Sequence, residues 1–117
     1  MRIGVLTGGG DCPGLNAVIR AIVRKAERHY DDQVIGFRDG WLGLLERDHL
    51  DLDVERMRGT LPRGGTILGS SRHHPFAVDG GPERVLEVVA ELEIDAVIVI
   101  GGEGTLTITH RMSQLGL

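Results

Sequence analysis

Two glycine-rich segments of this sequence each hold a carboxylate and each follow a short apolar run. The first, residues 8–14, contains Asp11, and the second, residues 101–104, contains Glu103. Glycine lets backbone N–H groups approach an anion closely, and the start of a following helix attracts negative charge. Mg²⁺ binds carboxylates and phosphate oxygens together. The two turns therefore predict a site for a phosphate group with Mg²⁺, with Asp11 and Glu103 near the metal.

Each turn also has a purely structural interpretation, in which glycine serves a tight turn and the acid only complements a helix dipole. The P-loop pattern is absent, and the dinucleotide pattern G-x-G-x-x-G is incomplete. Gly8 and Gly10 fit that pattern, but Pro13 occupies the place of its third glycine. Because Asp39 follows the second expected strand, as the ribose-binding acid of such proteins does, a nicotinamide-dependent oxidoreductase remains an alternative.

The elements that must position these turns alternate between strand and helix. Residues 94–100 are almost continuously apolar, which predicts a strand buried on both faces and hence a parallel sheet. Apolar residues recur at three-to-four spacing over residues 15–28, which predicts an amphipathic helix. Further strands are expected over residues 2–6, 33–37, 49–52 and 66–68, and further helices over residues 42–45, 54–61, 105–115 and after Pro82. The pattern predicts an α/β fold, doubly wound around a mainly parallel sheet in three Rossmann-like layers.

Length and composition set the class of protein. The 117 residues suit one domain, and 41% hydrophobic with 26% charged residues is typical of a soluble globular chain. A net charge of -4 without a basic run argues against nucleic-acid binding. No apolar run approaches the length of about 20 residues that a membrane helix needs. The single cysteine, Cys12, excludes an internal disulfide and fits a cytoplasmic location.

Four blocks resemble the phosphofructokinase family, and they occur in the family's order along the whole chain. They read GGDCPGLN at residues 9–16, DGWLGL at 39–44, GGTILGSSR at 64–72 and IGGEGT at 100–105. The resemblance implies transfer of a phosphoryl group from ATP to the 1-hydroxyl of fructose 6-phosphate, which yields fructose 1,6-bisphosphate in glycolysis. It also implies Mg²⁺ as the cofactor.

The resemblance assigns roles to particular residues. Arg72 is the catalytic arginine that reaches the transferring phosphate, and its fork of donors suits phosphate oxygens. Glu103 stands where the family has a magnesium-binding acid, usually aspartate. Trp41 matches an aromatic near the nucleotide, although a lone tryptophan is equally expected in a core. The nucleotide-binding set implied by the resemblance is Gly10, Trp41, Arg72, His73, Gly102, Glu103, Gly104 and Thr105.

Gly104 bears on the phosphoryl donor. In this family glycine at that position accompanies ATP, and aspartate accompanies pyrophosphate, because a carboxylate there repels the α-phosphate of a nucleotide. Arg20 and Arg24 lie one helical turn apart and match arginines that bind allosteric effectors at a subunit interface in bacterial relatives. A solvated basic face is the alternative interpretation of these two arginines.

The resemblance further implies that residues 1–117 form the N-terminal, donor-binding portion of a larger two-domain, homotetrameric enzyme. The general base and most sugar-phosphate contacts are then expected outside this chain. The chain alone is therefore expected to bind nucleotide without turnover. A pyrophosphate-dependent phosphofructokinase and a non-catalytic nucleotide-binding module remain alternatives, beside the oxidoreductase.

Overall fold

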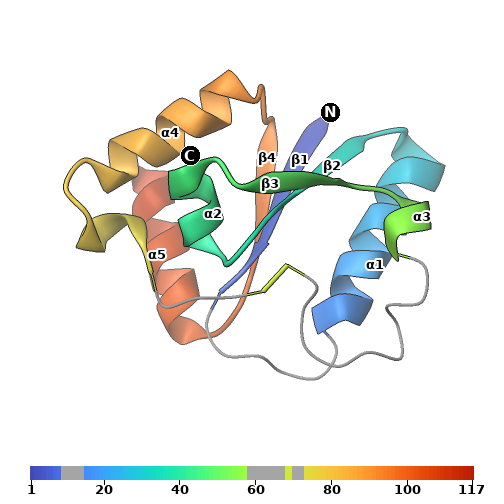
Figure 1. Ribbon diagram of the computed structural model, residues 1–117, viewed down its shortest axis with the longest axis horizontal. Helices are drawn as coiled ribbons and strands as arrows, with labels where there is room; N and C mark the ends of the chain where they lie inside the picture. Colours follow the sequence, from blue (N-terminus) through green and yellow to red (C-terminus); the bar gives the residue numbers. More distant parts are fainter. Residues whose placement is uncertain (9–14, 58–67, 70–72) are drawn as a thin grey trace.

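The computed structural model describes residues 1–8, 15–57, 68–69 and 73–117. Within these ranges strands and helices alternate, as the sequence predicts (Figure 1). The strands are β1 (Arg2–Thr7), β2 (Gln33–Phe37), β3 (His49–Leu52) and β4 (Ala96–Ile100). The α-helices are α1 (Leu15–Lys25), α2 (Trp41–Glu46), α3 (Val54–Met57), α4 (Gly81–Glu91) and α5 (Glu103–Gln114).

The described strands form one sheet in the order β3-β2-β1-β4. β1 runs parallel to both of its neighbours, β2 and β4, whereas β3 is antiparallel to β2. In this register Thr7, the last residue of β1, lies opposite Ile100, the last residue of β4. The expectation of a mainly parallel sheet is therefore confirmed. The carboxyl ends of β1 and β4 lie side by side at the same end of the sheet.

Helices cover both faces of the sheet, with α1 and α3 on one side and α2, α4 and α5 on the other (Figure 1). Alternating residues of β1 feed the two cores: Val5 joins the cluster beneath α1, and Leu6 joins the cluster beneath α2 and α4. Because successive strand residues point to opposite faces, one short strand supplies both cores. This arrangement confirms the doubly wound, three-layer α/β fold.

The helix boundaries depart from the expected ones in three places. The helix expected over residues 105–115 is α5, which begins two residues earlier, at Glu103. The helix expected over residues 15–28 is α1 followed by a π-helical turn, Ala26–Tyr30, which ends where Asp31 turns left-handed at φ 53°. The helix expected over residues 54–61 is described only as α3, since residues 58–67 lie outside the described residues. The strand expected over residues 66–68 also falls mostly outside them. None of the described helices is long and apolar enough to cross a membrane.

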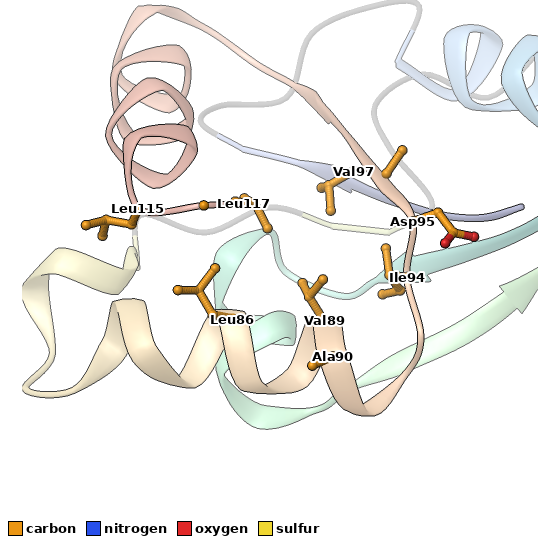
Figure 2. Close-up of a pocket in the computed structure, with 10 residues that line it drawn as sticks. Leu86, Val89, Ala90, Ile94, Asp95, Val97, Leu115 and Leu117 are labelled. Carbon is orange, nitrogen blue, oxygen red and sulfur yellow. The ribbon is translucent and has the colours of Figure 1, made fainter.

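The expectation that residues 94–100 form a strand buried on both faces is wrong for the described part of the chain. β4 is an edge strand, and its residues from Val97 to Ile100 are only partly buried. An apolar hollow of about 380 Å³ lies beside its amino end. Figure 2 shows the residues that line it, from α4, from β4 and from the end of the chain at Leu115 and Leu117. Among the described residues, the apolar run therefore has less cover than its composition predicts.

Candidate functional site

The carboxyl ends of β1 and β4 form a topological switch point. On one side of β1 lies β2, which follows α1 in the chain, and on the other side lies β4, which follows α4 (Figure 1). Helices α1 and α4 lie on opposite faces of the sheet. The backbone N–H of Gly8 donates a 2.8 Å hydrogen bond to the Ile100 carbonyl, which ties the two strand ends together. Open α/β sheets bind ligands in the crevice at such a point. The two glycine-rich turns therefore begin side by side, although residues 9–14, with Gly10 and Asp11, lie outside the described residues.

One part of this junction is tightly packed. A Cβ atom on Gly8 would lie 2.5 Å from Thr105 Oγ1, and a Cβ atom on Gly101 would lie 2.7 Å from the Gly8 carbonyl oxygen. Thr105 is 7% exposed, so its side chain is packed against the strand ends from the first turn of α5. Gly8, Gly101 and Thr105 thus fix where α5 begins relative to β1.

The next part is open. Gly102 and Gly104 are exposed, and a Cβ atom on either would have no other atom within 4 Å. Neither has a positive φ, so neither backbone conformation nor packing requires glycine there. Helix α5 begins at Glu103 with no side-chain cap, which leaves its first N–H groups available to a ligand. Bare N–H groups, a helix dipole and free space together suit an anion such as a phosphate.

Glu103 is exposed in the first turn of α5, beside this space. The described residues contain no group of three His, Cys, Asp or Glu side chains that would hold a metal ion alone. Mg²⁺ bound with a phosphorylated substrate needs no such group, because one or two carboxylates plus phosphate oxygens complete its shell. A single exposed glutamate is therefore compatible with a Mg²⁺ ion that binds together with a phosphorylated ligand.

A third segment reaches the same edge of the sheet. Thr7 Oγ1 donates a 2.7 Å hydrogen bond to the Gly69 carbonyl, and the Asp39 N–H donates a 2.8 Å hydrogen bond to the Leu68 carbonyl. Neither Thr7 nor Gly69 was predicted from the sequence to be a site residue. The only available signal was weak: a hydroxyl residue ends the strand directly before the first glycine turn.

The remaining expected nucleotide residues differ in exposure. His73 is exposed, and Arg72 lies outside the described residues. Trp41 is only 2% exposed and belongs to the core cluster beneath α2 and α4, which is the structural alternative left open by the sequence. Its indole Nε1 is buried and has no hydrogen-bond partner among the described residues. Any part that Trp41 plays toward a nucleotide must therefore act from within the core.

The basic residues of α1 and the other histidines lie elsewhere. Arg20 and Arg24 are half-buried on α1, one turn apart, and their role toward an effector stays a prediction. His49 and His110 are exposed, as expected of surface residues. His74 differs, since its Nδ1 atom is buried and lacks a hydrogen-bond partner among the described residues.

The sequence of this chain is similar to those of known phosphofructokinases. The family model described as "Phosphofructokinase" matches residues 2–116. The chain is 60% identical, over its whole length, to an ATP-dependent 6-phosphofructokinase 3 of Streptomyces coelicolor, of which it covers 34%. It is 55% identical over 97% of its length to a pyrophosphate–fructose 6-phosphate 1-phosphotransferase of the same organism, of which it covers 33%.

The fold is likewise similar to a solved structure. The chain superposes on the T-state crystal structure of Pichia pastoris phosphofructokinase with a TM-score of 0.89 at 35% identity, covering 97% of this chain and 13% of that one. The chain thus spans about a third of the length of the curated relatives that it matches, and less of this structural neighbour.

Proposed function

The chain belongs to the phosphofructokinase family, and on that premise we propose that it is the donor-binding part of a longer enzyme that phosphorylates fructose 6-phosphate. The observation that carries this proposal is the uncapped, open start of α5 at the switch point between β1 and β4. Gly102 and Gly104 leave space there, although neither packing nor backbone conformation requires glycine at these positions. A phosphoryl donor is the ligand for which the family would keep such room.

Each residue has a role in this proposal. The N–H groups at the start of α5 bind donor phosphate oxygens, and Glu103 holds Mg²⁺, which offsets phosphate charge when bound. Arg72 stabilises the charge that spreads over the transferring phosphoryl group. The packed contact of Gly8, Gly101 and Thr105 keeps α5 in register with β1, so that these groups stay in position.

We propose ATP as the donor. Gly104 is exposed and unobstructed, which leaves space for the α-phosphate that pyrophosphate lacks. The names of the relatives divide on this point, since similar proteins are called ATP-dependent and pyrophosphate-dependent. Pyrophosphate is therefore the second candidate donor. The family match argues against the oxidoreductase alternative, which depended on Gly8, Gly10 and Asp39.

Phosphate transfer itself is proposed only for the longer protein. We expect the 117 residues alone to bind donor without transferring phosphate, and the cytoplasm, a homotetramer and effector binding at Arg20 and Arg24 remain proposals for the longer protein. The test is a chimera in which this chain replaces the matching third of the Streptomyces coelicolor ATP-dependent relative.

A coupled assay of that chimera should show ATP-driven phosphorylation of fructose 6-phosphate. Arg72→Ala should lower kcat by a factor of about 10² or more, the usual cost of losing a donor that stabilises the transition state. A folded chimera without activity would contradict the proposed function. Turnover with pyrophosphate but not ATP would contradict only the donor, and an unchanged rate in Arg72→Ala would remove the catalytic role of that arginine.

A further inference from the structure

Residues 68–69 are held against the carboxyl ends of two strands by contacts from three directions. The buried Thr7 hydroxyl donates to the Gly69 carbonyl at 2.7 Å, across 62 positions of sequence. The backbone N–H of Asp39, just beyond β2, donates to the Leu68 carbonyl at 2.8 Å. The Leu68 side chain is 2% exposed and packs into the cluster beneath α1. This pair of residues is therefore fixed to the sheet.

The backbone at this anchor requires particular residues. Gly69 has φ +73°, and a Cβ atom placed on it would lie 2.6 Å from Asp39 Oδ1. Asp39 itself has φ 57°, which is uncommon for a residue other than glycine. Conformations of this kind cost free energy and persist where the surroundings enforce them, often at functional sites. The anchor is thus a specific arrangement, and the Thr7 hydroxyl is the side-chain donor that links it to β1.

The position of the anchor in the sequence connects it to the donor site. Gly10 follows Thr7 by three residues, and Arg72 follows Gly69 by three residues. The hydrogen bond from Thr7 to Gly69 therefore ties the described residues that precede Gly10 to those that precede Arg72. Gly10 and Arg72 themselves lie outside the described residues. At the same strand end, the Gly8 N–H is bonded to Ile100, next to the start of α5.

We propose that Thr7 is a positioning residue for the phosphoryl-donor site, acting through its hydrogen bond to the Gly69 carbonyl. This inference rests on the proposed function. By fixing the points at which these two segments leave the sheet, the bond lowers the entropy cost of ordering the site when the donor binds, and preorganisation of that kind raises affinity. Thr7 itself touches no substrate in this scheme.

The experiment compares Thr7→Val with Thr7→Ser in calorimetric titrations of this chain with ATP–Mg²⁺. Valine keeps the branched shape and removes the hydroxyl, whereas serine keeps the hydroxyl and removes a methyl group. Binding should weaken by about tenfold in Thr7→Val, the equivalent of one net hydrogen bond, and by less than about twofold in Thr7→Ser. The matched control is Val88→Ala, a change in the other core cluster that lowers stability without removing a polar group.

Fluorescence of Trp41, the only tryptophan, reports whether each variant is folded during the titration. If Thr7→Val does not fold, Thr7→Cys takes its place, because a thiol is a poor donor of similar size. Equal affinity in the wild type and Thr7→Val overturns the positioning role alone. Equal weakening in Thr7→Ser, or in Val88→Ala, assigns the effect to packing and overturns it too. Failure of the wild type to bind either ATP–Mg²⁺ or pyrophosphate–Mg²⁺ overturns the proposed function itself, whereas binding of pyrophosphate–Mg²⁺ alone overturns only the choice of ATP.

Discussion

Two adjacent glycines just after β4, Gly101 and Gly102, differ in the space around them. A side chain on Gly101 would meet the Gly8 carbonyl oxygen at 2.7 Å, whereas a side chain on Gly102 would meet nothing within 4 Å. Gly101 belongs to a junction that positions α5 against the sheet, and Gly102 belongs to the open start of that helix. The difference separates glycines that the fold requires from glycines that, in this account, a ligand requires.

The largest expected effect comes from breaking the packed side of this comparison. Gly101→Ala forces a Cβ atom against backbone, which cannot move aside as a flexible side chain would. We expect it to lower the free energy of unfolding by about 2–3 kcal/mol, the typical cost of overpacking. Urea unfolding followed by Trp41 fluorescence measures this change.

Gly102→Ala is the matched control for that experiment. It adds the same methyl group one residue later, in open space and at a φ of -84° that alanine adopts readily. Its free energy of unfolding should stay within about 0.5 kcal/mol of the wild type. Similar losses in the two variants would show that packing does not distinguish these glycines, and the comparison would fail.

A smaller effect, on binding and not on folding, should come from Gly104→Asp. Its carboxylate would lie in the first turn of α5, where it favours the helix dipole but repels a bound phosphate. We expect affinity for ATP–Mg²⁺ to fall by about tenfold, close to 1.4 kcal/mol, with the chain still folded.

Gly104→Ala separates charge from size in that titration. Alanine within a helix is favoured over glycine by up to about 1 kcal/mol, so the variant should be at least as stable as the wild type. If Gly104→Asp binds ATP–Mg²⁺ as tightly as Gly104→Ala does, the start of α5 is not where the nucleotide phosphates bind.

The smallest effect is expected from a pair that belongs to neither side of the comparison. Arg47, just after α2, donates two hydrogen bonds to the Glu91 carboxylate, at 2.8 and 2.9 Å. Chiefly because of these bonds, the pKa of Glu91 lies below its ordinary value. A carboxyl whose pKa is lowered by folding stabilises the protein above its unfolded pKa, and that stabilisation is lost as pH falls through the folded pKa.

Glu91→Gln should therefore reduce stability slightly at neutral pH, and the difference from the wild type should disappear in acid. The effect is small because both side chains are solvent-exposed. Unfolding curves at neutral and acidic pH measure it, and donor affinity should not change. A difference that grows on acidification would contradict the assigned ion pair.

The sequence predicts most of the fold because its strands and helices have clear periodicity and clear ends. Residues 33–37 and 49–52 are strands with the expected boundaries. β4 is where this reasoning fails. Its apolar run indicates that the strand is covered on both faces, but it does not indicate which part of a protein supplies that cover. In the part of the chain that the structure describes, β4 is an edge strand.

The candidate site was predicted less completely, for a physical reason. Residue types alone identify glycines and acids in a turn but do not separate Gly101 from Gly102, and only the family resemblance selects Gly102. The physical difference between the two glycines depends on atoms brought close by folding. The contact between Thr7 and Gly69 crosses 62 residues and ends on a backbone carbonyl, which no residue type announces. Trp41 shows the same limit, because its two interpretations differ only in burial.

A calorimetric titration of this chain with ATP–Mg²⁺, pyrophosphate–Mg²⁺ and NAD in turn tests whether the open start of α5 is a phosphoryl-donor site. We expect ATP–Mg²⁺ to bind at one site, more tightly than pyrophosphate–Mg²⁺, and NAD not to bind. Tighter binding of pyrophosphate would contradict the choice of donor alone. Binding of NAD without ATP, or binding of neither phosphoryl donor by the folded chain, would contradict the claim that the open start of α5 is a phosphoryl-donor site.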